Sequence, residues 1–261
     1  MHAHRTIVFL ASAALASAAC VGAQDPPEAP TGAAADAVQE NNGLTWNGLT
    51  SSGLMVNGLL VNGLMVNGLT TATLGENDSV MAALTDPGAR LALKYLVSCA
   101  LPPDQSISLD VDGVSYTFPG GLGLAPDWSV PGGSCDGNCI AWVSGCMLSR
   151  VNYLGQHVAV SLRGAVSELA VTEAERSSFP NPEAAYYGDV FADPQRRFAC
   201  TAPGSTLISR VCGPSLPDCI MDVLGSCADV CDPPDPSDGS YANCRDDQGR
   251  IVPGAVTVYR Q

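Results

Sequence analysis

Histidine is almost absent from this chain. Of the 261 residues only three are histidine, and two of them, His2 and His4, lie in an N-terminal segment with the character of an export signal. His157 alone cannot supply the two histidines of a His-x-x-x-His or His-Glu-x-x-His site, which argues against a zinc hydrolase. A Ser-His-Asp or Cys-His centre would have to use His157, and no Gly-x-Ser-x-Gly motif accompanies it. We interpret His157 as a structural or surface residue, and the sequence indicates no catalytic residue and no cofactor.

Positive charge is scarce as well. The chain has a single lysine, Lys94, and its formal net charge is −14. Nucleic acids and anionic membrane surfaces attract basic proteins, so neither is an expected partner. Divalent cations remain possible ligands, because Asp232, Asp235 and Asp238 form a short acidic loop whose oxygen atoms would suit Ca²⁺. The alternative, which we favour, is a solvated acidic loop.

Long apolar runs are confined to the N-terminus. Arg5 precedes an uninterrupted run of apolar and small residues at 7–19, which is too short to span a bilayer as a mature helix. The pattern predicts a signal peptide over residues 1–23 and hence an extracytoplasmic protein. A second interpretation stays open, since Cys20 resembles a lipoprotein cysteine, although Ser17 stands where such signals usually carry leucine. The mature protein is then either secreted or an outer-membrane lipoprotein, with membrane contact only through the lipid anchor.

Cysteine, by contrast, is abundant, with 11 in the chain. Without Cys20 an even set remains, and in an exported protein such a set predicts a disulfide framework. Spacing alone does not fix the pairing. The alternative, reduced cysteines that bind zinc, needs a reducing compartment or histidine partners. The predicted disulfide cysteines are Cys99, Cys135, Cys139, Cys146, Cys200, Cys212, Cys219, Cys227, Cys231 and Cys244.

A five-residue unit occurs six times between residues 42 and 71, with Asn or Ser, then Gly, then Leu at its first three positions. The leucines lie at 44, 49, 54, 59, 64 and 69, and Leu74 keeps the phase. A period of five fits neither a helix nor a strand and marks a repeat architecture. The spacing resembles the pentapeptide-repeat family, which implies a short β-solenoid with Leu44 through Leu74 inside. This chain has Asn or Ser two residues before each leucine, where that family favours Ala. A flexible spacer is the alternative.

The order of repeat and cysteine-rich domain is similar to that of a group of uncharacterised exported bacterial proteins, in which Asn-Ala-Leu or Asn-Gly-Leu pentads come first. The stretches that carry this resemblance are 94–101, 121–128, 142–146 and 186–191. The resemblance covers most of residues 40–261 and implies neither an activity nor catalytic residues.

The fold class that we expect is α+β, with a disulfide-stabilised globular domain preceded by a short β-solenoid-like repeat. The expected segments are a signal peptide (1–23), a linker (24–41), the repeat (42–77) and the cysteine-rich domain (78–261). The linker is rich in Pro and Ala and cannot build a core.

Local patterns predict the first elements of the domain. Asp86 followed by Pro87 predicts the start of a helix, because Asp is a good N-cap and Pro suits the first helical position. Apolar alternation on both sides of Asp112-Gly113 predicts a β-hairpin with a tight turn.

A second helix is expected from Asp136 to about Tyr153. Cys139 and Cys146 are seven residues apart and share one face of it, so Cys99 of the first helix could reach one of them. Further expectations are strands at 158–162 and 255–259, a short helix after the capping-box pattern at 172–175, and a loop-rich segment at 200–244.

We expect a non-enzymatic binding or structural protein of the cell envelope or extracellular space. Its ligand in that location is unknown. A secreted hydrolase that uses a carboxylate pair or His157 is the alternative. Trp128, Tyr186 and Tyr187 could line a sugar-binding platform, but core packing is the commoner fate of such residues. A deep cleft around His157 or paired carboxylates would favour the hydrolase, and a shallow surface with exposed Tyr or Trp would favour binding.

Overall fold

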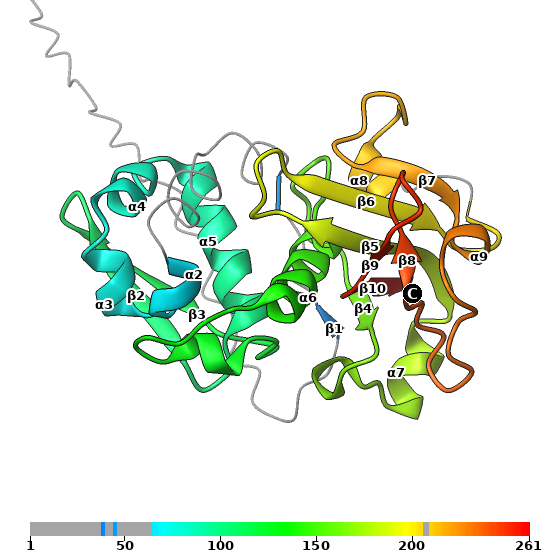
Figure 1. Ribbon diagram of the computed structural model, residues 1–261, viewed down its shortest axis with the longest axis horizontal. Coiled ribbons are helices and arrows are strands. Elements are labelled where there is room, and N and C mark those ends of the chain that lie inside the picture. The colour runs from blue at the N-terminus through cyan, green and yellow to red at the C-terminus, as the bar shows by residue number, and fades with distance from the viewer. Residues whose placement is uncertain (1–37, 40–43, 46–63, 206–208) are drawn as a thin grey trace, which may run out of the picture. The chain divides into compact units, whose positions relative to one another are not determined.

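The computed structural model describes residues 38–39, 44–45, 64–205 and 209–261, which belong to one compact unit spanning Ala34–Gln261 (Figure 1). The expected signal peptide, Cys20 and most of the linker lie outside the described residues, as does the repeat between residues 46 and 63. The described part combines helices and strands, which confirms the α+β class. Within these residues, no helix is both long enough and apolar enough to cross a membrane.

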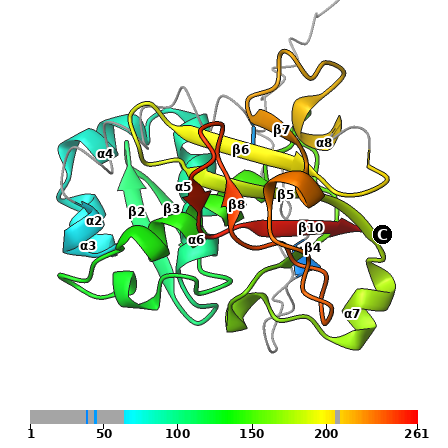
Figure 2. The ribbon, with the colours of Figure 1, turned by 45° about the vertical axis from the view of Figure 1, so that its right-hand side comes forward.

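A six-stranded sheet is built from the C-terminal part of the chain together with one short strand from residues 38–39. In spatial order its strands are β1 (Val38–Gln39), β4 (Val160–Arg163), β10 (Val256–Arg260), β5 (Asn181–Asp189), β6 (Arg196–Thr201) and β7 (Asp222–Ser226). Neighbours are antiparallel except β6 and β7, which are parallel. Figure 2 shows β4, β10, β5 and β6 side by side. The strand predicted at 255–259 is confirmed as β10, whereas β4 begins only at Val160 and Val158 is exposed.

The two faces of this sheet carry different cores. Along β5, Ala184 and Tyr186 belong to the main hydrophobic cluster, whereas Ala185 and Tyr187 belong to a second cluster. The alternation follows from the two-residue period of a strand. α6 (Gly137–Ser149) covers the face with the main cluster. The face with the second cluster is covered by the segment that contains α9 (Cys227–Val230), β8 (Cys244–Arg245) and β9 (Ile251–Val252).

The N-terminal region is mainly helical. Its elements are α2 (Leu64–Asn67), α3 (Thr71–Gly75), α4 (Asp78–Ala83), α5 (Pro87–Ala100), β2 (Ser106–Val111), β3 (Val114–Pro119) and the 3-10 turn η2 (Pro126–Ser129). The predicted hairpin is confirmed as β2 and β3. Asp112 and Gly113 both have positive φ, at 52° and 79°, which the tight hairpin turn requires.

Two predicted helix caps are confirmed. The carboxylate of Asp86 accepts a hydrogen bond from the backbone N–H of Ala89 at the start of α5. The hydroxyl of Thr172 accepts one from the N–H of Glu175 at the start of α7 (Glu173–Ser178). Both contacts satisfy N–H groups that have no partner within the helix.

α6 lies between the helical region and the sheet, and its N-cap is Asp136, as predicted. The helix ends at Ser149, however, rather than near Tyr153. The reason is that Val151 leaves the helix and forms a parallel β-bridge with Leu44 of the repeat.

All ten predicted cysteines are paired. The disulfides are Cys99–Cys146, Cys135–Cys139, Cys200–Cys227, Cys212–Cys219 and Cys231–Cys244. The first joins α5 to α6, which confirms that Cys99 reaches α6. The segment 200–244 holds three bridges and only short elements, α8 (Ser209–Cys212), β7 and α9 among them. This many disulfides indicates an oxidising, extracytoplasmic location.

The described part of the repeat forms a β-bridge and two short helices. Leu44 makes the bridge, and residues 64–77 contain α2 and α3 rather than turns of β-structure. Leu44, Leu69 and Leu74 are buried, as expected for inward-facing repeat leucines. Their side chains belong to the main hydrophobic core of the domain. The described pentads are therefore in direct contact with the domain.

Candidate functional site

A buried charged cluster lies between the sheet and α6. Glu183 of β5 accepts hydrogen bonds from Arg210 Nη2 at 2.7 Å and from Tyr186 Oη at 2.6 Å. Arg260 of β10 makes an ion pair with the same carboxylate at 3.3 Å. The side chains of Glu183 and Arg210 are 1% and 4% exposed, so the pair is shielded from solvent.

Arg210 ties this cluster to the C-terminal end of α6. Its guanidinium donates to the carbonyl oxygens of Ser149 at 2.9 Å and of Val151 at 2.6 Å. Carbonyls at a helix C-terminus lack partners within the helix, and the helix dipole favours a cation there. One arginine therefore joins β5, α6 and α8.

Electrostatics keep the cluster ionised. Burial opposes the charged form of Glu183, but Arg210 and the hydrogen bonds from Arg210 and Tyr186 outweigh it and hold the carboxyl pKa below its usual range. Burial, together with the charge of Glu183, raises the pKa of Tyr186 well above normal. At neutral pH the cluster is an ion pair with a neutral tyrosine, and removal of one charge would leave the other uncompensated.

The cluster supports an exposed apolar surface. The backbone N–H of Tyr153 donates to the carbonyl of Arg210 at 2.7 Å. The Tyr153 ring covers Gly213, where an added Cβ would lie 2.8 Å from the ring. Tyr153 and Leu154 are 42% and 68% exposed, and Leu216, in the disulfide loop that follows α8, is 37% exposed. An exposed tyrosine is one of the features that we expect of a binding protein.

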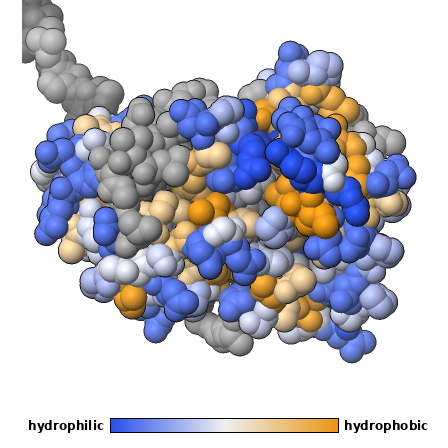
Figure 3. All heavy atoms as spheres, viewed as in Figure 1, coloured by the Kyte–Doolittle hydropathy of each residue, from blue (hydrophilic) through white to orange (hydrophobic). Residues whose placement is uncertain are grey.

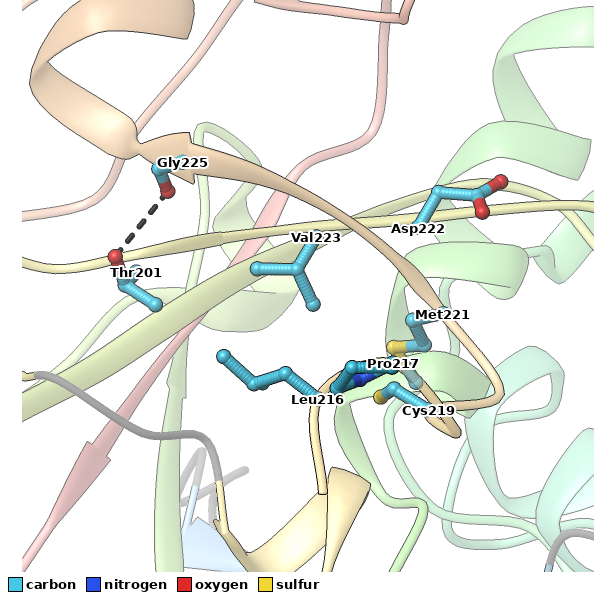
Figure 4. A pocket seen from close by; sticks show the side chains of 8 residues that line it. All are labelled: Thr201, Leu216, Pro217, Cys219, Met221, Asp222, Val223 and Gly225. Atoms are coloured by element: carbon cyan, nitrogen blue, oxygen red, sulfur yellow. Dashed lines mark hydrogen bonds between the residues drawn. The ribbon is translucent and has the colours of Figure 1, made fainter.

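A groove of about 490 Å³ lies between this disulfide loop and β7 (Figure 4). Leu216 and Pro217 form one wall, and the side chain of Val223 points toward Leu216 from β7. The carboxylate of Asp222 points away from these apolar side chains. Figure 3 shows hydrophobic residues at the surface around β7, among hydrophilic ones. Thr201 and Asp222 also line the groove, so it offers polar groups beside its apolar wall.

The first pentad is anchored next to Tyr153, at residues 150–152. The N–H of Leu44 donates to the carbonyl of Arg150 at 3.3 Å, and its carbonyl accepts from the N–H of Asn152 at 2.9 Å. The Leu44 side chain is fully buried. The repeat therefore contributes both backbone pairing and core volume to the domain.

The last two pentads are anchored to residues 128–135. The hydrogen bonds run from Leu69 N–H to Trp128 O at 2.6 Å, from Gly132 N–H to Asn67 O at 3.1 Å and from Cys135 N–H to Met65 O at 2.9 Å. Gly68 between them has a φ of +88°, and a Cβ there would overlap the carbonyl oxygen of Val130. This position needs glycine both for its backbone conformation and for the close approach.

Two further arginines are buried among aromatic rings. The guanidinium of Arg150 lies 4.6 Å from the centre of the Tyr95 ring, and that of Arg163 lies 3.5 Å from the centre of the Tyr259 ring. Arg163 also donates to the carbonyl of Asp238 at 2.7 Å. Cation–π contact and carbonyl binding give both arginines a role in holding the chain together.

The acidic loop uses its carboxylates within its own turns. Asp235 accepts from the N–H and hydroxyl of Ser237, Asp238 from the N–H of Ser240, and Asp232 from the side-chain amide of Asn243. Hydrogen bonds from Ser237 lower the pKa of Asp235. Among the described residues the potential metal ligands that converge are Cys200, Cys231 and Cys244, and all three are disulfide-bonded.

The remaining predicted site residues lie apart from one another. His157 is exposed in the loop between α6 and β4, and its imidazole has no hydrogen bond or ion pair with any residue that the structure describes. Trp128, Tyr186 and Tyr187 are fully buried and form no exposed platform. Trp128 packs edge-on against Phe191, with ring centres 6.1 Å apart, which is the core packing that we expected.

The sequence analysis missed Glu183, Arg210 and Tyr153. One signal was present for Glu183, because this glutamate interrupts the apolar sequence of β5 in front of Ala184 and Ala185. A charged residue in a buried strand needs a partner. Neither the identity of that partner nor the exposure of Tyr153 follows from a local pattern.

The fold and these contacts define a disulfide-stabilised α+β protein with an apolar surface supported by buried charges. A comparison of the chain with protein-family models, curated proteins and solved structures finds no match in any of the three. The functional assignment therefore rests on the site itself.

Proposed function

We propose that this is an exported, non-enzymatic binding or structural protein that contacts an extracellular or cell-envelope ligand. The observation that carries the proposal is the exposure of Tyr153, Leu154 and Leu216, on two segments that the hydrogen bond from Tyr153 to Arg210 holds together. These side chains are exposed although the surrounding backbone is fixed by a disulfide and by the buried pair of Glu183 and Arg210. Pre-organised, exposed aromatic and aliphatic groups suit binding, because little conformational entropy is lost on contact.

The repeat has a structural role in this proposal. Its first and last pentads insert leucines into the domain core, so the repeat is a part of the folded module. The resemblance to exported proteins with Asn-Gly-Leu pentads supports this proposal, as does the resemblance to pentapeptide repeats, whose leucines point inward. Export through the signal peptide, with either secretion or lipid attachment at Cys20, belongs to the same proposal.

Co-sedimentation with outer-membrane vesicles and with peptidoglycan sacculi tests the binding role. The variant is Tyr153→Ser/Leu154→Ser/Leu216→Ser, and the matched control is Val114→Ser, because Val114 is 52% exposed on the distant hairpin. Wild type and control should sediment with one of the two materials, and the triple variant should remain in solution. Equal behaviour of all three proteins would rule out this surface as the binding site.

The hydrolase alternative is tested separately. Model esters, peptides and glycans are incubated with the wild type and with His157→Ala. We expect no turnover by either protein. Turnover by the wild type that falls by about a thousandfold or more in the variant would replace the binding proposal with the enzymatic one.

A further inference from the structure

The disulfide Cys135–Cys139 differs from the other bridges in what it constrains. It spans four residues, whereas Cys99–Cys146 spans 47 and Cys200–Cys227 spans 27. A cross-link that closes so small a loop restricts the unfolded chain least, so its contribution to global stability is the smallest of the five. Cys139 is also partly exposed, unlike the cysteines of the two long-range bridges.

The same disulfide sits at the end of the segment that holds the last two pentads. The backbone N–H of Cys135 donates to the carbonyl of Met65, and that of Gly132 donates to the carbonyl of Asn67. The carbonyl of Trp128 accepts a hydrogen bond from the N–H of Leu69. Cys139, at the other end of the bridge, is fixed in the first turn of α6 by the Asp136 cap. The bridge thus adds a covalent link between the segment that holds these pentads and α6, whose inner face is buried.

We propose that Cys135–Cys139 is a reducible clasp that controls the docking of the last two pentads, through residues 65–69, on residues 128–135. A dithiol of the exported compartment is the reductant. Its thiolate attacks Sγ of Cys139, the S–S bond breaks, and Cys135 leaves as a thiolate that takes a proton. The second thiol of the reductant then attacks the mixed disulfide and releases Cys139, so the protein pair is reduced and the reductant becomes a disulfide.

Opening of the clasp removes the covalent link between the side chains of Cys135 and Cys139. Cys135 is then held to α6 only through the Asp136 cap, and the contacts with the repeat lose part of their support. Met65 and Leu69 are 9% and 1% exposed in the closed state, so undocking would uncover apolar side chains of the repeat. The three hydrogen bonds between residues 65–69 and residues 128–135 then open more often, and the rest of the domain keeps its remaining bridges. This device operates independently of the proposed ligand-binding surface.

Reduction by dithiothreitol followed by alkylation and peptide mass spectrometry tests the first step. In the full-length native protein Cys135 and Cys139 should be alkylated at lower reductant concentration than Cys99, Cys146, Cys200, Cys227, Cys231 and Cys244. Simultaneous or later alkylation of Cys135 and Cys139 would overturn the proposal.

Amide hydrogen exchange tests the second step. In the variant Cys135→Ser/Cys139→Ser the amides of Leu69 and Gly132 should exchange at least roughly tenfold faster than in the wild type, because the loop constraint is gone. The matched control is Cys212→Ser/Cys219→Ser, which removes the other short bridge and should leave these two amides unchanged. Mildly reduced wild type provides a second measurement that needs no substitution. Unchanged exchange in both the variant and the reduced wild type would refute the clasp.

Discussion

The helical region at residues 64–135 and the sheet region at 151–261 are stabilised by different kinds of contact. Among the described residues, every buried polar or charged side chain lies at Ser144 or later in the chain. The helical region instead buries leucines, valines and aromatic rings and satisfies its helix ends with local caps. Helix caps involve neighbours in sequence, whereas the buried charges of the sheet region need partners such as Glu183 and Arg210, which are 27 residues apart.

The largest expected effect lies in the sheet region. Glu183→Ala leaves Arg210 buried without its carboxylate, so we expect a loss of about 3–5 kcal/mol in the free energy of unfolding. Urea denaturation measures it. The double variant Glu183→Leu/Arg210→Met removes both charges and should recover a large part of the loss. A double variant as unstable as Glu183→Ala would show that the cluster acts through shape rather than charge.

The next effect tests the helical region and the repeat. Leu69→Ala removes most of a buried side chain and leaves a cavity in the core. We expect the free energy of unfolding to fall by about 2–5 kcal/mol. Leu154→Ala is the control, because this leucine is 68% exposed and its loss should change stability by less than about 0.5 kcal/mol. Similar small changes in both variants would mean that the last pentad is not part of the core.

Acid should affect the sheet region selectively. The pKa of Glu183 is lower in the folded state than its unfolded value of about 4.3, so its stabilising contribution is complete above that pH. The contribution disappears as the pH falls through the folded-state pKa. We therefore expect the unfolding free energy to drop below about pH 4, and to drop less steeply in Glu183→Gln. Parallel pH profiles for the two proteins would contradict the assigned charge state.

The smallest effect is expected at His157. His157→Ala removes an exposed side chain from a loop and should change the free energy of unfolding by less than about 0.5 kcal/mol. Thermal denaturation of the variant beside the wild type measures this. A larger loss would reveal a structural contact of the imidazole.

Sequence patterns predicted the parts of the fold that local contacts determine. Asp86 with Pro87, Asp112 with Gly113, and Asp136 each marked the element that the structure contains, because a cap or a tight turn involves only adjacent residues. The disulfide state was also predictable, since an even set of cysteines in an exported chain is sufficient evidence.

Long-range contacts explain what the sequence did not predict. α6 was expected to reach Tyr153 and stops at Ser149, because Val151 pairs with Leu44 more than a hundred residues earlier in the chain. The exposure of Tyr153 was not predicted for the same reason. Tyr153 acquires its position from Gly213 and Arg210, and no spacing within the sequence connects these residues.

Native-state hydrogen exchange of the Leu44 and Leu69 amides tests most directly whether the pentads belong to the folded module. Both N–H groups donate to backbone carbonyls of the domain, at 3.3 and 2.6 Å, and both leucine side chains are buried. We predict that these amides are protected to nearly the same extent as amides in the centre of α5. Exchange at the rate of an unstructured peptide, with α5 still protected, would contradict this account. It would show instead that the repeat is a flexible spacer.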